Sequence, residues 1–523
     1  MAPAAYRTGA PSGFSPTAPG VLARWLLPNL AAILAVASLA YSLFVFNGGE
    51  QFFRDSDSGW HIRNGESILA HRALPGTDPY SFSKAAEPWV AWEWGSDVLL
   101  GLAHRMDGLR GVTFLIALAI SACVWLWCRL QFAVAGDFFL IAVLAPPMIT
   151  TASLHWLARP HIFGWLFLVA AVLYAERVPL RLSATQLVVI ATATALWANL
   201  HPSFLLAPSI ALIYGVSHLA RPLLWSLDRH LESTRARSFF LAAAAALAGS
   251  SLNPYGWRLH AHVLSYLTHD ELTSRVAEFQ SFNFHDKDAA QVALVMALSA
   301  AGAILALTQK KLAHFLLAAV LLWGGLRSAR VLPLVALVIL PLVNGAFTEG
   351  LHRALDLRPQ LRRALDSALG YSSRLARIDQ RLNGVGFMCV CLLISLAVVR
   401  APAYSRGIGF PSRQFPVAAA QAVEKLPAHA RLLATDSYGG YLIYRFDGAR
   451  KVYFDGRSDF YGSDFMKQYL VLINARPGWQ DIVRSFRFTH ALLPKDSALT
   501  GALMQAGWLP LHSDPVATLL EAR

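Results

Sequence analysis

Two carboxylates and an imidazole lie close together in one short polar stretch of the sequence, Phe53–Glu66. Asp55, Asp57 and His61 stand there soon after a long apolar run, Leu26–Phe46. A carboxylate can take a proton from a reacting hydroxyl, and an imidazole exchanges protons near neutral pH. Charged groups beside a membrane span are costly unless water, a ligand or a counter-charge receives them. The stretch therefore predicts the edge of a polar site that opens beside the bilayer.

Other polar residues recur at the ends of apolar runs on the same predicted side of the membrane. They are His155, Arg159, His161, Asn199, His201, Asn253, Tyr255, Glu278, Gln280, His285 and Arg330. The centres of the runs are almost free of charge. A carrier of ions or charged solutes would place ionisable groups or broken helices near the bilayer midplane. The distribution instead predicts a site that faces one compartment.

The composition is that of a polytopic α-helical membrane protein. Of 523 residues, 55% are hydrophobic and 15% are charged, and the mean hydropathy is +0.43, whereas a soluble domain carries about 25% charged residues. Many runs approach the roughly 20 apolar residues that cross a bilayer as a helix. About eleven spans are predicted: Leu26–Phe46, Gly111–Leu130, Phe138–Leu157, Ile162–Ala175, Leu187–Leu200, Phe204–Leu219, Phe239–Leu252, Ala290–Leu307, Leu312–Leu326, Val331–Val343 and Val385–Val399.

The basic residues predict the orientation. A net charge of +13 would suggest nucleic acid in a soluble chain, but here Arg and Lys concentrate in alternate loops, as the positive-inside rule requires. No nucleic-acid partner is therefore expected. With a cytoplasmic N-terminus, the outer loops carry few basic residues, chiefly Arg159, Arg327 and Arg330. This orientation places Asp55, Asp57 and the C-terminal part of the chain outside.

Composition divides the chain into three regions. Residues 1–24, rich in Ala, Pro and Gly, are predicted to be a disordered cytoplasmic tail. Residues 25–400 form the membrane domain, in which the first outer loop, 47–110, carries two surface helices, Gly59–His71 and Trp92–Met106. Residues 401–523 have the composition of a small soluble α/β domain. Its expected strands are Arg431–Thr435, Lys451–Phe454, Thr489–Leu493 and Val516–Leu520, and its expected helices are Tyr438–Arg445, Asp464–Arg476 and Leu499–Ala506.

No metal or other cofactor is assigned. Asp55, Asp57 and an outer histidine offer oxygen and imidazole donors that suit Mn²⁺ or Mg²⁺, but nothing fixes their spacing. The four cysteines, Cys123, Cys128, Cys389 and Cys391, lie within apolar runs. Their expected role is packing, because neither a disulfide framework nor a cysteine metal site is indicated.

The polar stretches resemble those of a known family. Asp-Ser-Asp-Ser-Gly-Trp-His-Ile-Arg-Asn-Gly-Glu, followed by Pro-Gly-Thr-Asp-Pro-Tyr-Ser-Phe-Ser and Trp-Glu-Trp, resembles the first outer loop of bacterial GT-C-fold glycosyltransferases related to protein mannosyltransferases and lipid A aminoarabinose transferases. Ala-Arg-Pro-His, Trp-Ala-Asn-Leu-His-Pro, Asn-Pro-Tyr-Gly-Trp, Gly-Gly-Tyr-Leu-Ile and Phe-Asp-Gly-Arg resemble a bacterial branch of that superfamily.

The resemblance implies sugar transfer from a polyprenyl-phosphate donor to a glycan, lipid or protein acceptor on the outer side of the bacterial inner membrane, with a periplasmic C-terminal domain. Asp57 best matches the acidic residue that acts as base or orients the acceptor, Asp55 comes second, and His61 is a third catalytic candidate. The candidates for donor phosphate binding are Arg159, Lys84, Arg330 and His201. Those for acceptor or sugar binding are Glu93, Asn199 and Glu278. The aminoarabinose transferases carry Lys-Pro-Pro in this loop, whereas Lys84 is followed here by Ala-Ala-Glu-Pro, so only the lysine matches.

Each of these roles has a structural alternative. Asp55 and Asp57 would equally cap the following helix, and His61 would pair with a carboxylate. Arg159 and Arg330 would serve as interfacial anchors. The remaining span-end and turn residues would satisfy local hydrogen bonds: Asn199, His201, Asp455, Arg457 and Asp459. Two other functions stay open, a transporter or flippase of lipid-linked glycans and a non-catalytic scaffold for envelope assembly.

Overall fold

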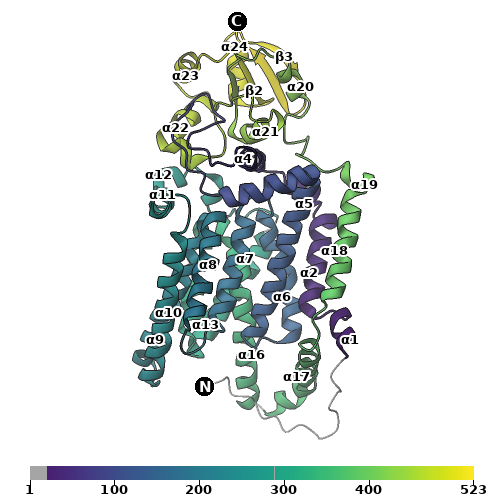
Figure 1. Ribbon diagram of the computed structural model, residues 1–523, viewed down its shortest axis with the longest axis vertical. Coiled ribbons are helices and arrows are strands. Elements are labelled where there is room, and N and C mark those ends of the chain that lie inside the picture. The colour runs from purple at the N-terminus through teal and green to yellow at the C-terminus, as the bar shows by residue number, and fades with distance from the viewer. Residues whose placement is uncertain (1–19, 288, 358) are drawn as a thin grey trace.

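The computed structural model describes residues 20–523 except 288 and 358. A bundle of long helices carries a smaller C-terminal body on one end, and helices of the first outer loop lie between the two (Figure 1). The bundle contains α1 (Val21–Leu26), α2 (Leu30–Ala40), η1 (Tyr41–Val45), α5 (Trp94–Ala133), α6 (Phe138–Ala152), α7 (His161–Ala175), α8 (Ala184–Leu200), α9 (Leu206–Leu224), α10 (Arg229–Ser250), α13 (Ala289–Thr308), α14 (Leu312–Arg327), α15 (Leu332–Leu334), η6 (Val335–Ile339), α16 (Leu340–Leu357), α17 (Pro359–Asp379) and α18 (Val385–Arg400). Most of the predicted disordered tail lies outside the described residues, and α1 occupies four of its last residues.

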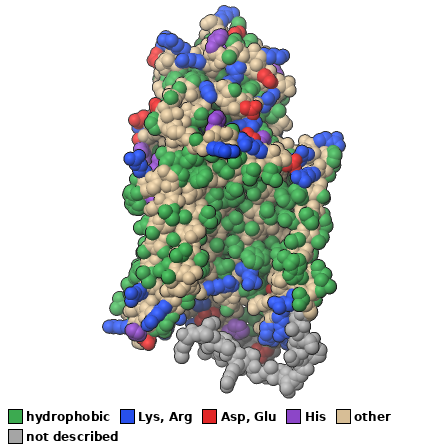
Figure 2. All heavy atoms as spheres, viewed as in Figure 1, with side chains coloured by type: hydrophobic (Ala, Val, Ile, Leu, Met, Phe, Trp, Pro, Cys, Tyr) green, Lys and Arg blue, Asp and Glu red, His purple; other side chains and the backbone are tan. Residues whose placement is uncertain are grey.

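Six helical stretches among the described residues are long and apolar enough to cross a membrane: Val21–Val45, Trp94–Ala133, Phe138–His155, Pro202–Leu224, Ala289–Thr308 and Ala329–Ala354. Four shorter apolar helices are His161–Ala175, Ala184–Leu200, Leu312–Arg327 and Val385–Arg400. Hydrophobic side chains cover the middle of the bundle, and charged ones gather toward its two ends (Figure 2). These features indicate a membrane-embedded protein.

A helix covers each of the eleven predicted spans. Helix α10 differs from the others, because its first half carries Arg229, Glu232, Arg235 and Arg237, and it is not among the ten apolar helices. The number of spans therefore stays a prediction. Of the cysteines, Cys123 and Cys128 are buried in α5, as packing requires, whereas Cys389 is exposed on α18.

Short elements gather at the end of the bundle that faces the C-terminal body. They are α3 (Gly48–Gln51), α4 (Asp57–His71), η2 (Ser153–His155), η3 (Pro202–Leu205), α11 (Trp257–Leu267), α12 (Asp270–Thr273), η4 (Ala277–Phe279), η5 (Ala329–Val331) and α19 (Pro402–Ser405). Helix α5 belongs to both layers, because its backbone leaves helical geometry at Asp107 and Gly108. Its first part lies across the end of the bundle, and its second part runs down through it (Figure 1).

Two glycines let α4 cross the first part of α5 in direct backbone contact. A Cβ atom at Gly65 would lie 1.7 Å from the carbonyl oxygen of Asp97, and one at Gly101 would lie 2.6 Å from the backbone nitrogen of Glu66. Only glycine tolerates such an approach at both positions. The crossing fixes the first turn of α4, which begins with Asp57, relative to the start of α5.

The residues after 400 contain a four-stranded sheet in the order β1-β2-β4-β3, with β1 (Leu432–Ala434), β2 (His490–Pro494), β3 (Leu509–Ser513) and β4 (Ala517–Glu521). Strand β1 pairs with β2 in parallel, and the other two pairs are antiparallel. Five helices accompany the sheet: α20 (Ala419–Glu424), α21 (Asp436–Arg445), α22 (Ser458–Ile473), α23 (Trp479–Phe486) and α24 (Ala498–Gln505). The expected strand at Lys451–Phe454 is wrong, because Val452 makes only an isolated bridge, with Ser81.

The first outer loop and the C-terminal body are joined by buried contacts. The backbone N–H of Val452 donates to the carbonyl of Tyr80 at 3.0 Å. Arg457, which is 2% exposed, binds Asp455 at 2.7 Å and Asp78 of the loop at 2.8 Å. A buried arginine is tolerated when carboxylates satisfy its donors, as they do here. The C-terminal body therefore closes one side of the space above the bundle.

Candidate active site

A cavity of about 870 Å³ lies between the bundle, the first outer loop and the C-terminal body. Its polar wall brings together residues that are far apart in the sequence: Asp55, Asp57, Glu93, Arg159, Glu278 and Arg330. Its apolar wall contains Trp165, Leu168, Leu206, Val263, Leu267 and Leu334. One space thus offers charged groups on one side and a hydrocarbon-like surface on the other.

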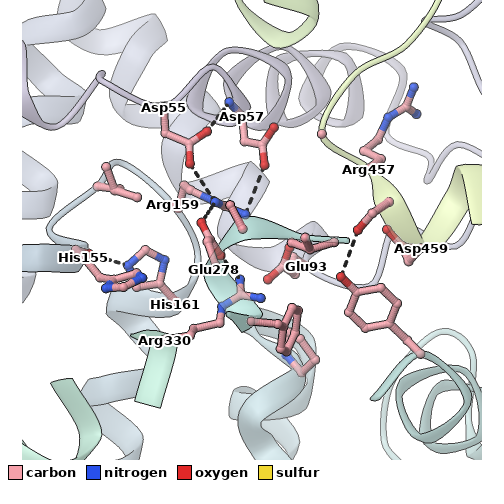
Figure 3. Close-up of a pocket in the computed structure, with 18 of the residues that line it drawn as sticks. Asp55, Asp57, Glu93, His155, Arg159, His161, Glu278, Arg330, Arg457 and Asp459 are labelled. Carbon is pink, nitrogen blue, oxygen red and sulfur yellow. Dashed lines mark hydrogen bonds and ion pairs between the residues drawn. The ribbon is translucent and has the colours of Figure 1, made fainter. Parts of the chain in front are cut away.

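Arg159 is the centre of the polar wall. Its guanidinium lies 2.7 Å from Asp55 and 2.6 Å from Glu278 through Nη1, and 3.1 Å from Asp57 through Nη2. Arg330 lies 3.2 Å from the other oxygen of Glu278. Figure 3 shows the three carboxylates turned toward Arg159, with Arg330 beside Glu278.

Hydrogen bonds to backbone carbonyls bring these residues together. The N–H of Ala158 donates to the carbonyl of Phe52 at 2.8 Å, which sets Arg159 beside the stretch that leads into α4. The hydroxyl of Ser328 donates to the carbonyl of Glu278 at 2.9 Å and so holds η4 against η5, which carries Arg330. The position of each charge is therefore defined by the fold around it and not by the ion pairs alone.

Asp55 accepts a hydrogen bond from the first N–H group of α4 and is also part of the site. Its Oδ1 accepts a hydrogen bond from the N–H of Asp57 at 2.9 Å, while its Oδ2 binds Arg159. A carboxylate at a helix start is favoured by the free N–H groups there. The capping role and the site role are therefore compatible for this residue.

The surroundings shift the pKa values of the cluster in different directions. Burial and the charge of Asp55 raise the pKa of Asp57 to about 7, against the pull of Arg159. Burial also acts on Glu278, but Arg159 and Arg330 hold the pKa of that carboxyl well below its usual range. Asp57 is thus poised to exchange a proton near neutral pH, whereas Glu278 stays ionised.

Glu93 occupies a separate part of the polar wall, immediately before α5. Its Oε1 lies 3.4 Å from Nε2 of His201, and its Oε2 lies 3.9 Å from Nε2 of His61. Burial and the charge of Asp97 raise the pKa of Glu93 to about 8. The pKa of this carboxyl, like that of Asp57, therefore lies near neutral pH.

Asn199 and His61 lie outside the cavity and contact residues next to those that line it. The indole N–H of Trp94 donates to Asn199 at 2.9 Å, which joins the start of α5 to the end of α8 and sets Glu93 opposite His201. His61 is fully buried, and its Nδ1 lies 2.6 Å from Asp97. Neither Asn199 nor His61 lines the cavity.

Lys84 lies apart from the other predicted residues. Its ammonium group pairs with Glu87 at 2.9 Å and lies over the ring of Phe460, and it does not line the cavity. The predicted residues that do meet there are Asp55, Asp57, Arg159, Arg330, His201, Glu93 and Glu278.

Several lining residues were not among the predicted site residues. His155 and His161, which precede and follow Arg159 in the sequence, line the cavity, and Asp459 lines it from the C-terminal body. The spacing in His-Trp-Leu-Ala-Arg-Pro-His carried a signal for both histidines. No comparable signal marked Asp459, because its place depends on how the C-terminal body docks.

The three carboxylates of the cluster all contact the guanidinium of Arg159, which occupies the space that a metal ion would need. Among the described residues, no group of three or more His, Cys, Asp or Glu side chains is arranged to hold a metal ion. Asp55, Asp57 and Glu278 each lie within 3.1 Å of Arg159. In this arrangement they do not fit a divalent cation, because the arginine charge would repel it.

A scan of protein-family models finds no family that matches the chain, and a search of curated proteins finds no match. The solved structures that match include the oligosaccharyltransferase of Archaeoglobus fulgidus. Its apo form gives a TM-score of 0.57 over 89% of this chain and 69% of that one, at 13% sequence identity. Its complex with Zn and sulfate gives 0.53 over 89% and 68%, at 11% identity. The likeness shows the fold alone: this chain has a GT-C-like fold, as that oligosaccharyltransferase has.

Proposed function

We propose that the protein is a glycosyltransferase that moves a sugar from a polyprenyl-phosphate donor to an acceptor on the outer side of a bacterial inner membrane. The acceptor is a glycan, a lipid or a protein. In this proposal the N-terminus is cytoplasmic and the C-terminal body is periplasmic. One observation carries the proposal, namely that a carboxyl poised near neutral pH and two arginines share a cavity with a long apolar wall, in a GT-C-like fold.

The two walls suit an amphiphilic donor. The apolar wall, with Trp165, Leu206 and Leu334, would receive the first isoprene units, since burying such surface is favourable by about 25 cal/mol per Å². Arg330 is the better phosphate ligand of the two arginines, because it has one carboxylate partner in the cluster where Arg159 has three. Arg159 would hold Asp57 and Asp55 in place and complete the positive charge around the leaving phosphate.

Asp57 is the base in this proposal. The hydroxyl oxygen of the acceptor forms a bond to the anomeric carbon of the donor sugar, the bond from that carbon to the phosphate oxygen breaks, and polyprenyl phosphate leaves. The hydroxyl proton passes to Asp57. A base works best when its pKa lies near the working pH, and the pKa of about 7 for Asp57 meets that condition.

A metal has no part in these steps. The positive charge among the three carboxylates of this cavity is supplied by Arg159.

The test uses the protein in lipid nanodiscs with a polyprenyl-phosphate hexose and a membrane extract as the source of acceptor. We expect the wild type and the exposed control Asp496→Asn to release polyprenyl phosphate, and Asp57→Asn to bind the donor but lose release by at least a hundredfold, as loss of a general base costs. Equal release by Asp57→Asn would remove this residue as the base. Failure of the wild type to bind any polyprenyl-phosphate sugar would overturn the donor class.

A second variant pair tests the phosphate ligand. Arg330→Gln should weaken donor binding about tenfold or more, because a charge-assisted hydrogen bond is worth roughly 1.5–3 kcal/mol. The matched control is Arg327→Gln, which removes an arginine that packs on Trp323 near the same end of the bundle and does not line the cavity. Equal Kd values for the two variants would return Arg330 to the role of an anchor.

A further inference from the structure

Glu93 faces two imidazoles, and the hydrogen bonds behind these rings favour one tautomer of each. In His201, Nδ1 accepts a hydrogen bond from the backbone N–H of Ser203 at 3.1 Å. In the neutral ring the proton is then on Nε2, which is the atom that points to Oε1 of Glu93 at 3.4 Å. His201 therefore offers Glu93 a donor.

His61, in contrast, offers Glu93 a hydrogen-bond acceptor. Its Nδ1 lies 2.6 Å from Oδ1 of Asp97, whose other oxygen accepts from the side-chain amide of Asn64 at 2.6 Å. With Nδ1–H donating to Asp97, Nε2 of the neutral ring carries a lone pair. This atom is buried, has no hydrogen-bond partner among the described residues, and lies 3.9 Å from Oε2 of Glu93. A buried acceptor without a donor is costly.

Glu93 thus has a donor, His201, near one carboxyl oxygen and an unsatisfied acceptor, His61, near the other. This environment suits a protonated carboxylic acid better than a carboxylate. A protonated Glu93 would face the Nε2–H of His201 with one oxygen and direct its O–H toward the unpaired Nε2 of His61 from the other, over distances of 3.4 and 3.9 Å that a small movement of the side chain would close to hydrogen bonds. An ionised Glu93 would instead place negative charge opposite the lone pair of His61. The ring of His61 keeps its direction because it is stacked on Trp60, with centroids 3.6 Å apart.

The charges around Glu93 favour the same form. Asp97 on α5 and Asp459 on α22 face it with negative charge, while Arg159 and Arg330 face it with positive charge. Both arginines also bind other carboxylates of the cluster. Burial and the charge of Asp97 raise the pKa of Glu93 above that of an ordinary glutamate, to about 8.

We propose that Glu93 is a neutral carboxylic acid in the resting cavity and that in this form it binds a hydroxyl group of an anionic, sugar-bearing ligand. A carboxylic acid offers a hydroxyl both a donor and an acceptor. It also adds no negative charge to a wall that already contains Asp55, Asp57 and Glu278. The sugar-bearing nature of the ligand rests on the proposed function, whereas the proton on Glu93 does not.

The proton is tested without any ligand, by infrared spectroscopy of the protein in nanodiscs at pH 7. The wild type should show the carbonyl stretch of a protonated carboxyl that is absent from Glu93→Gln and that disappears as the pH is raised from 7 to 9. Glu278→Gln is the matched control, because that carboxylate is held ionised and its loss should leave the band in place. An identical band in wild type and Glu93→Gln would overturn the proposal.

The binding role is tested by the Kd for a polyprenyl-phosphate hexose between pH 6.5 and 9.5, a range in which the phosphodiester itself does not titrate. Wild-type binding should weaken above about pH 8, approaching tenfold for each further pH unit. Glu93→Gln, which keeps a donor and an acceptor, should bind with a Kd that does not change above about pH 8, where Asp57 is already ionised. The same pH dependence in both proteins would overturn the binding role. Absence of binding at every pH, with the infrared band present, would overturn the donor class and the binding role and leave the proton in place.

Discussion

Asp57 acquires its basicity from burial and, after that, from an imbalance of charge around it. Three carboxylates, Asp55, Asp57 and Glu278, meet two guanidiniums, those of Arg159 and Arg330. Glu278 contacts both arginines and stays ionised, so the excess negative charge falls on the aspartates. One buried carboxyl of such a group holds its proton to a higher pH. A residue that would be an inert anion in water thereby becomes a base near neutral pH.

This imbalance predicts a bell-shaped dependence of kcat/KM on pH. Activity should rise through about pH 7 because the base Asp57 works only after it loses its proton, and should fall above about pH 8 because Glu93 then ionises. The measurement is initial rates of polyprenyl phosphate release from pH 5 to 10. Glu93→Gln should keep the rising limb and lose the falling one. A falling limb that persists unchanged in this variant would assign it to another group.

The sequence predicted most of the charged residues that meet in the cavity but not how each one is used. Asp57, Arg159, Glu278 and Arg330 could be found because each ends a span or follows one on the same side. Lys84 stands in the same loop but pairs with Glu87 three residues later. Position along a span predicts the side of the membrane, whereas the direction of a side chain depends on tertiary contacts that the pattern does not contain.

At the scale of elements, α4 is set against α21 by glycine. A Cβ atom at Gly59 would lie 2.2 Å from the carbonyl oxygen of Gly440, and one at Gly440 would lie 2.2 Å from that of Ser56. The Gly-Gly-Tyr-Leu-Ile motif thus allows the C-terminal body to touch the backbone that carries Asp57. This contact explains in physical terms why small residues occur in both stretches.

Gly440→Ala should therefore destabilise the protein by about 1–3 kcal/mol, because the added methyl group forces α21 away from α4. The measurement is thermal unfolding followed by tryptophan fluorescence in detergent. The matched control is Gly501→Ala in α24, where a Cβ atom would meet nothing within 4 Å and alanine favours the helix. Equal unfolding midpoints for the two variants would mean that α21 can move away from α4 without a loss of stability.

Two errors in the predicted strands show that local sequence pattern alone does not decide strand pairing. Lys451–Phe454 has the composition of a strand, yet it runs beside the first outer loop and makes a single bridge with Ser81. Strand β3 was not predicted, because it contains Pro510 and is mostly exposed. Its pairing with β4 has a register irregularity after Pro510. Pairing partners that are distant in the sequence decided both cases.

At the scale of the whole molecule, one buried arginine joins the first outer loop to the C-terminal body. Arg457 binds Asp78 and Asp455, and it lies over the rings of Trp89 and Phe460. Tyr461 also donates to Asp455, at 2.9 Å. Arg457 lines the cavity, but its side chain points away from the Arg159 cluster (Figure 3). Its contribution is to keep the cavity closed on the side of the C-terminal body.

Arg457→Leu should cost about 3–5 kcal/mol, since it leaves two buried carboxylates without their partner. Hydrogen exchange should rise in residues 76–89 and 452–461 before it rises in the bundle. The control is Arg484→Leu, which removes an exposed arginine that pairs with Asp481 and should change stability by less than about 1 kcal/mol. A matching exchange pattern in both variants would show that the two parts dock without help from Arg457.

The cavity can serve an outer compartment only if its end of the bundle faces outward. The opposite end carries many basic residues in or beside its helix ends, among them Arg177, Arg181, Arg235, Arg237 and Lys311, and the positive-inside rule predicts that this end faces the cytoplasm. Single cysteines at two exposed positions, Asp496→Cys between β2 and α24 and Thr185→Cys at the start of α8, test this in a background with Cys389 and Cys391 changed to Ser. An impermeant maleimide added to spheroplasts should label Asp496→Cys at once and Thr185→Cys only after lysis. The reverse pattern would place the cavity in the cytoplasm, where the sugar would have to be transferred before the lipid carrier crosses the membrane.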